Sequence, residues 1–175
     1  FSDTHGVGTL DAIIFRYAEV LLIRAEAGAE LGKDPELDLT VNALRKRVGF
    51  NVKLTSSPAT DPKLVAKHPI IKGTNADLIR EIRRERRVEL FGEGLRYADL
   101  MRWGCGERLV APKAGMMLYT DVYTPEEIAV LKTEVGTYAD GSLDVYGKRV
   151  TTPAIFESPK HYLFSLPLNE MALNP

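Results

Sequence analysis

The sequence has few of the residues from which reactive or cross-linked sites are built. It contains one cysteine, Cys105, which excludes an internal disulfide and a zinc site made of cysteines. Its three histidines, His5, His68 and His161, are scattered and lack the spacing of metal ligands. The sequence therefore predicts no metal site.

An excess of charge of one sign is also missing. Lysine and arginine number 23 against 24 aspartates and glutamates, which gives a net charge of −1 and argues against nucleic acid as the main ligand. Charged residues interrupt the most apolar region between Arg16 and Glu26, so no apolar run reaches the length of a membrane span. A hydrophobic content of 45% over 175 residues is ordinary for one globular domain or a piece of a larger one.

Helical periodicity is strongest near the start of the chain. Residues 12–31 predict a helix with a wide apolar belt, nearly buried, that ends at Gly32. Asp34 and Pro35 predict the N-cap and first position of a second helix, which ends near residue 49. The short link between the two helices predicts an antiparallel helical hairpin.

A second helix pair is expected over residues 76–104. Thr74 and Asp77 have the spacing of a capping box at its start, and Gly104 closes it. This pair repeats the plan of the first, over residues 12–49. The pattern predicts a mainly α fold made of repeated helical hairpins.

The rest of the chain has weaker periodicity. Prolines and polar residues predict a loop over residues 50–73. Residues 105–160 predict a loop-rich segment, with a capped helix over 124–134 and a small hairpin around Asp140-Gly141. The last residues, 161–175, predict an extended tail.

Opposite charges alternate beside large apolar residues in the stretch "ERRVELFGEGLRYADLMRWG", residues 85–104. An acid/base site needs two carboxylates with different environments, but every carboxylate in this stretch has arginines within reach, which would lower all their pKa values together. Phosphate binding needs uncompensated positive charge, and the arginines at 80, 83, 84, 86 and 87 are interleaved with glutamates. Ion pairs on a solvated helix face explain these arginines better.

We therefore expect a structural salt-bridge network. Its pairs would span the Gly92–Gly94 turn and fix one helix to the next through the planar fork of arginine. Its expected members are Glu85, Arg86, Glu89, Glu93, Arg96, Asp99 and Arg102.

Four ordered motifs carry a family resemblance. They read "RYAEVLLIRAEA" at 16–27, "VNALRKRVG" at 41–49, "IRRERRVELFGEGLRYADLMRWG" at 82–104 and "LFSLPLNEMALNP" at 163–175. Together they resemble the C-terminal signature of SusD/RagB-type outer-membrane nutrient-binding lipoproteins. The resemblance implies tetratricopeptide-like helix pairs that support irregular loops, with residues 1–175 as the C-terminal portion of the domain.

The resemblance also implies a function. Members of the family bind glycans at the cell surface without catalysis and deliver them to a SusC-like TonB-dependent transporter of the outer membrane. A lipid on an N-terminal cysteine, which this chain lacks, would anchor the protein to the outer membrane; no cofactor and no nucleic acid are implied. The alternative is a helical-repeat scaffold that mediates protein–protein interaction.

Tyrosines in the loop-rich segment are the candidate ligand-binding residues. Tyrosine offers a flat apolar ring with a polar tip, and loops commonly carry function. The same rings could instead anchor the loops by packing, as we expect of Tyr17, Tyr97 and Trp103 in the helices. The candidates are Tyr119, Tyr123, Tyr138 and Tyr146.

Overall fold

The computed structural model of the protein describes residues 14–110, 115–138, 141–144 and 154–163. The chain divides into two compact units, Phe1–Arg96 and Tyr97–Pro175. In the described residues the regular structure is helical, with isolated β-bridges in place of strands, so the predicted mainly α fold is confirmed. None of the helices in this part of the chain is long and apolar enough to cross a bilayer.

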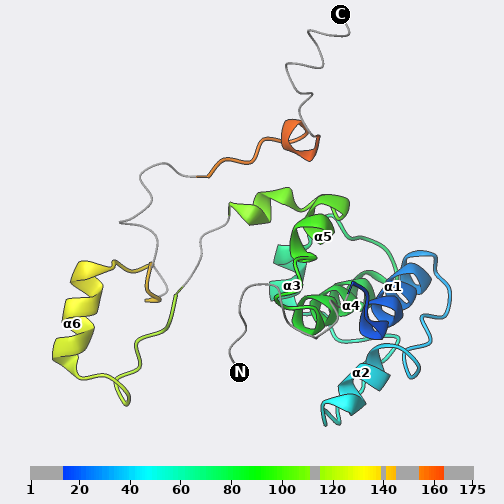
Figure 1. Ribbon diagram of the computed structural model, residues 1–175, viewed down its shortest axis with the longest axis horizontal. Helices are drawn as coiled ribbons and strands as arrows, with labels where there is room; N and C mark the ends of the chain where they lie inside the picture. Colours follow the sequence, from blue (N-terminus) through cyan, green and yellow to red (C-terminus); the bar gives the residue numbers. More distant parts are fainter. Residues whose placement is uncertain (1–13, 111–114, 139–140, 145–153, 164–175) are drawn as a thin grey trace, which may run out of the picture. The chain divides into compact units, whose positions relative to one another are not determined.

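The elements follow one another along the chain as Figure 1 shows. They are α1 (Tyr17–Glu30), α2 (Val41–Arg47), α3 (Pro62–Lys67), α4 (Ala76–Glu89), α5 (Arg96–Arg102), the 3₁₀ helix η1 (Gly106–Leu109), α6 (Pro125–Glu134) and the 3₁₀ helix η2 (Lys160–Tyr162).

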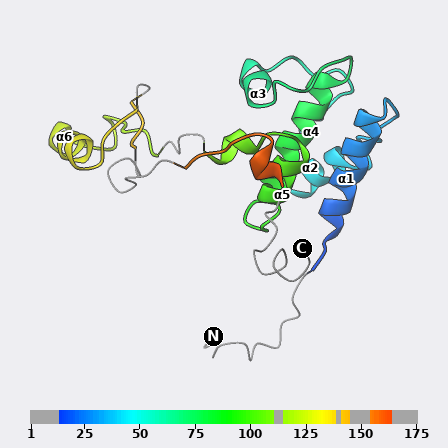
Figure 2. The ribbon, with the colours of Figure 1, turned by 90° about the horizontal axis from the view of Figure 1, so that it is seen from above.

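The core of the first unit lies where α1 meets α4 and α2. The three helices lie side by side in both ribbon views (Figures 1 and 2), and α3 packs against α4. Leu22, Ala25, Val41 and Ile82 are fully buried there. The small side chain of Ala25 lies in this core beside the larger leucines of the same helix.

α1 differs from the prediction in its start and in its burial. It begins at Tyr17 rather than at residue 12. It ends as predicted, because Gly32 has a φ of 64° and the Lys33 N–H donates to the Gly28 carbonyl at 2.8 Å. The expectation that α1 is nearly buried is wrong, since Tyr17 is 73% exposed and Val20 is 54% exposed.

α2 is shorter than predicted. The Asp34 carboxylate accepts a hydrogen bond from the Glu36 N–H at 2.8 Å, and Glu36 adopts a φ of 49°. This Asx turn places a left-handed residue where the helix was expected to begin, so the helix starts only at Val41. Asp34 does bind the backbone, but it shapes a turn instead of capping a helix.

The predicted loop over residues 50–73 contains α3. Asp61 accepts from the Lys63 N–H at 2.8 Å, and Pro62 occupies the first helical position. The Asp-Pro pair was the available signal for this helix, and the prediction, which rested on the prolines and polar residues of the segment, did not use it.

The predicted capping box at the start of α4 is wrong. Asn75 is the N-cap and makes no capping hydrogen bond with its side chain, which donates to the Ala29 carbonyl at the end of α1 instead. The Asp77 carboxylate accepts from the Thr60 hydroxyl at 2.6 Å and from Arg80 at 2.7 Å. Tertiary partners therefore replace the local ones expected from spacing.

The second unit has a small core around the end of α5. Leu100, Trp103 and Cys105 are buried together, which confirms Trp103 as a core residue. The Arg102 guanidinium lies 4.8 Å from the centre of the Trp103 ring. Tyr97 is 49% exposed, so its predicted packing role is wrong, as it is for Tyr17.

α6 matches its prediction closely. The Thr124 hydroxyl accepts from the Glu127 N–H, and the Glu127 carboxylate accepts from the Thr124 N–H, which completes the capping box. Bridges between Thr137 and Leu143 and a turn at Gly141 mark the predicted hairpin, although they do not extend into strands. Asp140 and most of the tail lie outside the described residues.

Candidate functional site

An ion-pair cluster joins the start of α1 to the end of α4. The Arg16 guanidinium contacts the Glu89 carboxylate at 2.6 Å and donates to the Glu93 carboxylate at 2.8 Å, and it also donates to the Glu89 carbonyl. Arg47, at the end of α2, contacts the same Glu89 at 2.7 Å. The Glu93 and Glu89 carboxylates raise the pKa of Arg16, and the Arg16 hydrogen bond lowers the pKa of Glu93.

The remaining expected members of the network include further charged pairs. Glu85 contacts Arg45 of α2 at 2.5 Å, and Arg86 contacts Glu19 of α1 at 3.5 Å. Asp99 pairs with Arg102 within α5 at 3.0 Å, and Arg96 is the first residue of that helix. The ion pairs of Glu85, Arg86 and Glu89 connect α4 to α1 and α2. Pairing across the Gly92–Gly94 turn stays a prediction.

The expectation of a solvated arginine-rich face on α4 holds for Arg84 and Arg87, which are exposed, and is wrong for the other three arginines. Arg80, Glu81, Arg83 and Arg86 are all buried, because α4 is covered by α1 on one flank and α3 on another. Arg83, for example, donates to Glu26 of α1 at 3.2 Å. A charge is tolerated at such depth only with a partner, which is what these pairs supply.

Glu81 is a buried carboxylate of α4 whose pKa is raised. Burial raises its pKa, although the nearby guanidinium of Arg84, at 2.5 Å, acts in the opposite direction. One of its oxygens is buried without a well-aligned hydrogen bond. The raised pKa of Glu81 therefore follows mainly from its burial.

A cleft of about 740 Å³ lies beside this cluster, in the first unit. Its polar walls are already paired: Arg45 donates to the Val52 carbonyl at 2.8 Å and to Glu85, and its guanidinium covers the Phe50 ring at 5.3 Å. A ligand would have to displace these contacts to bind there. Its lining residues are Arg16, Leu44, Arg45, Arg47, Val48, Phe50, Glu85, Val88 and Glu89.

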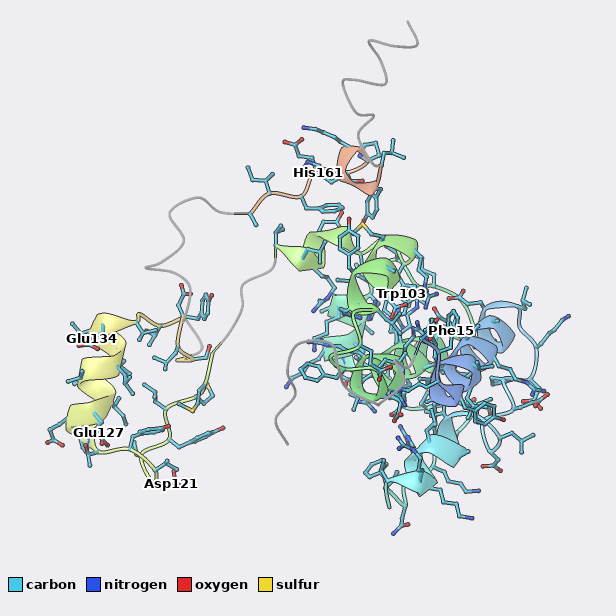
Figure 3. The ribbon with its side chains drawn as sticks, in the orientation of Figure 1. Phe15, Trp103, Asp121, Glu127, Glu134 and His161 are labelled. Atoms are coloured by element: carbon cyan, nitrogen blue, oxygen red, sulfur yellow. The ribbon has the colours of Figure 1, made fainter. Side chains whose placement is uncertain are left out.

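The candidate tyrosines occupy the turn before α6 and the bridge after it. The Tyr123 N–H donates to the Tyr119 carbonyl at 3.0 Å, so a single backbone turn brings these two residues together. Figure 3 labels Asp121 inside this turn and Glu127 and Glu134 along α6. Tyr146 lies outside the described residues.

The three candidate tyrosines that the structure describes differ in their exposure and in the contacts of their hydroxyls. Tyr119 is 60% exposed. Tyr123 is half-buried and its hydroxyl approaches the Met116 sulfur at 3.4 Å, while the Tyr138 hydroxyl donates to Asp144 at 2.9 Å. Tyr119 is therefore the open ring, whereas Tyr123 and Tyr138 also help to hold the loop.

Sequence reasoning missed the apolar neighbours of Tyr119. Met116, Met117 and Val122 are exposed within three residues of Tyr119 in the chain, and we call residues 116–122 the 116–122 patch. Asp121 is exposed within it and supplies a carboxylate acceptor. The signal was present in the run "MMLYTDV", where large apolar side chains follow one another with no helical or strand period.

This arrangement can bind a flat ligand. An exposed ring flanked by aliphatic side chains offers a flat apolar platform, and adjacent polar groups can accept or donate hydrogen bonds. Within the described residues, no group of three or more His, Cys, Asp or Glu side chains is placed to hold a metal ion.

Comparison with known proteins places the chain in a family. It is 36% identical over 104 residues to the SusD-like protein P38 of Formosa agariphila, a match that covers 59% of this chain and 19% of that protein. It also resembles the crystal structure of a SusD-like carbohydrate-binding protein from Bacteroides fragilis, with a TM-score of 0.60 and 30% identity, over 91% of this chain and 27% of the other. The matched parts of the chain thus span 19% and 27% of the length of these relatives. The model of the SusD family matches residues 2–175, and the chain belongs to this family.

Proposed function

We propose that this chain is part of a non-catalytic protein that binds glycans. The observation that carries the proposal is membership of the SusD family together with the similarity to a solved carbohydrate-binding member. The 116–122 patch supports it, because an exposed tyrosine ring beside aliphatic side chains is a surface on which a sugar ring can stack. Residues 1–175 would be the C-terminal portion of the domain.

Titration with glycans tests the proposal directly. The complete gene product that contains this chain should bind at least one member of a panel of soluble oligosaccharides, measured by isothermal titration calorimetry, and should leave every member chemically unchanged. Absence of binding across the panel, or cleavage of a bound glycan, would contradict the proposed function.

The location of the site needs its own variant. Tyr119→Ala should weaken glycan binding by about tenfold, which corresponds to about 1.4 kcal/mol, because the stacking surface is lost. Val130→Ala is a suitable control, since Val130 lies on α6 and is 53% exposed. Unchanged affinity of Tyr119→Ala would move the site away from the 116–122 patch and leave glycan binding itself in place.

The proposed partner is a SusC-like TonB-dependent transporter, to which the bound glycan would be delivered. The protein would be a surface-exposed lipoprotein of the outer membrane, held by a lipid anchor on the complete gene product. The support is family membership alone. Affinity purification of the tagged complete protein from outer membranes should recover such a transporter, and protease treatment of intact cells should remove the protein.

A further inference from the structure

The 116–122 patch lies beside the beginning of α6, where carboxylates gather. Asp121 is exposed in the turn that follows Tyr119, and Glu126 and Glu127 are exposed in the first turn of the helix. Figure 3 shows Asp121 and Glu127 at this end of α6 and Glu134 at the other end. Three carboxylates therefore follow the open ring of Tyr119 within eight residues of the chain.

The segment that carries these carboxylates has no cation of its own before the end of α6. Residues 115–131, all of which the structure describes, contain no lysine, arginine or histidine, and Lys132 lies in the last turn of the helix. The Leu143 N–H donates to the Met116 carbonyl at 3.1 Å, and the residue after Leu143 is a further carboxylate, Asp144. In the sequence, residues 111–150 hold six carboxylates against four lysines and arginines. The surroundings of the patch are therefore negatively charged.

The beginning of α6 does not offset this charge for an anionic ligand. Free N–H groups at the start of a helix attract anions. In α6, however, the Thr124 hydroxyl accepts from the Glu127 N–H at 3.3 Å, and Pro125 has no N–H to donate. The carboxylates of Glu126 and Glu127 also lie in the first turn. An anionic sugar would meet carboxylates in the place where it needs donors.

The chemistry of the ligand follows from this charge. Carboxylate and sulfate groups of acidic glycans are bound by charge-assisted hydrogen bonds from arginine and lysine. Neutral sugars instead present hydroxyls, which donate to carboxylates such as Asp121, and an apolar ring face, which stacks on rings such as Tyr119. We propose that the glycan bound at the 116–122 patch is made of neutral sugars, without carboxylate or sulfate groups. This inference rests on the proposed function and adds the chemical class of its ligand.

A panel of hexasaccharides of equal length tests the charge class. The neutral members are hexamers of glucose, mannose and xylose, and the acidic members are hexamers of galacturonic acid, mannuronic acid and sulfated galactose. In the complete gene product at 0.1 M salt, the tightest neutral member should bind at least about tenfold more tightly than the tightest acidic member, measured by isothermal titration calorimetry, because like charges repel. An acidic member that binds as tightly as the neutral ones would overturn the inference and leave the proposed function in place. Absence of binding across the whole panel would overturn the proposed function, and this inference with it.

A charge reversal tests whether the patch sets this preference. Asp121→Lys and Glu134→Lys change the net charge equally, and both residues are exposed. The 10 residues of α6 span about 15 Å, which exceeds the screening length of about 10 Å in 0.1 M salt, so Glu134 is the matched control. Asp121→Lys should narrow the affinity ratio between neutral and acidic glycans at least about threefold, and Glu134→Lys should change it by less than about 1.5-fold. An unchanged ratio in Asp121→Lys, or equal changes in the two variants, would overturn the inference.

Discussion

α1 and α6 are both helices that the sequence predicted, but different interactions hold them. α1 has no side-chain N-cap hydrogen bond, and it buries six residues against its neighbours. α6 has a complete capping box with proline at its first position, and none of its residues is buried. Packing is therefore the main support of α1, and local hydrogen bonding is the main support of α6.

The contrast extends to the charges around the two helices. The start of α1 is fixed by the ion pairs of Arg16 with Glu89 and Glu93, two residues that lie far away in the sequence. The carboxylate of the α6 cap, Glu127, binds the backbone only three residues away. A change near α1 should therefore alter the stability of the whole first unit, and a change near α6 should stay local.

The largest expected effect is the loss of packing on α1. Leu22 is fully buried, so Leu22→Ala in the complete gene product should lower the free energy of unfolding by about 2–5 kcal/mol, measured by urea denaturation. Val130→Ala on α6 is the matched control and should change it by less than about 0.5 kcal/mol. Similar costs for both variants would remove the distinction between the two helices.

The next largest effect should come from the ion-pair cluster. Glu89→Ala leaves Arg16 and Arg47 without a shared acceptor and should cost roughly 1.5–3 kcal/mol, measured in the same way. Glu157→Ala removes an exposed pair with Lys160 in the second unit and should leave the urea midpoint unchanged. If Glu89→Ala is as mild as this control, the cluster contributes nothing beyond an ordinary surface pair.

A smaller and local effect is expected at the cap of α6. Thr124→Ala removes the acceptor for the Glu127 N–H and should weaken the helix by about 1 kcal/mol, or about fivefold in its opening equilibrium. Amide hydrogen exchange should accelerate in α6 and stay constant in α1. Acceleration in both helices would show that α6 is coupled to the core.

The smallest effect concerns Glu81 and Glu93, whose pKa values shift in opposite directions. The lowered pKa of Glu93 adds stability above the ordinary glutamate pKa, and this stability is lost as the pH falls through the lowered value. The raised pKa of Glu81 acts in reverse, so its ionisation costs stability as the pH rises. At neutral pH, Glu93→Gln should therefore lower the melting temperature. Glu81→Gln should raise the melting temperature, with a gain of less than about 1 kcal/mol in the free energy of unfolding. Shifts of the same sign in the two variants would contradict this assignment.

Some elements could be predicted because their signals are local. The capping box of α6 lies within four consecutive residues, and the glycine at the end of α1 requires only a positive φ. The start of α2 was mispredicted although its signal is also local, because Asp34 can cap a helix or shape an Asx turn with the same hydrogen bond. α3 was missed because its Asp-Pro start lies in a segment whose prolines and polar residues predicted a loop.

The candidate site was predictable only in outline. Tyrosines in a loop-rich segment are visible in the sequence, but their spacing does not tell which ring is open and which is held. The hydroxyl of Tyr123 contacts the Met116 sulfur, and the hydroxyl of Tyr138 donates to Asp144. Tyr119 is exposed.

By itself the sequence determined the mainly helical character, the positions of most helices and the motifs of the SusD family, since periodicity and caps act over a few residues. Only the tertiary structure decided which charges are buried and with whom they pair. Arg45 and Glu85 are 40 residues apart, and Arg16 and Glu93 are 77 apart. From the sequence, a helix face lined with arginines is predicted to be solvated, although neighbouring helices can cover it. An apolar face is predicted to be buried, although the structure can leave it exposed. The burial of a face depends on which element packs against it, and chain spacing alone does not encode that choice.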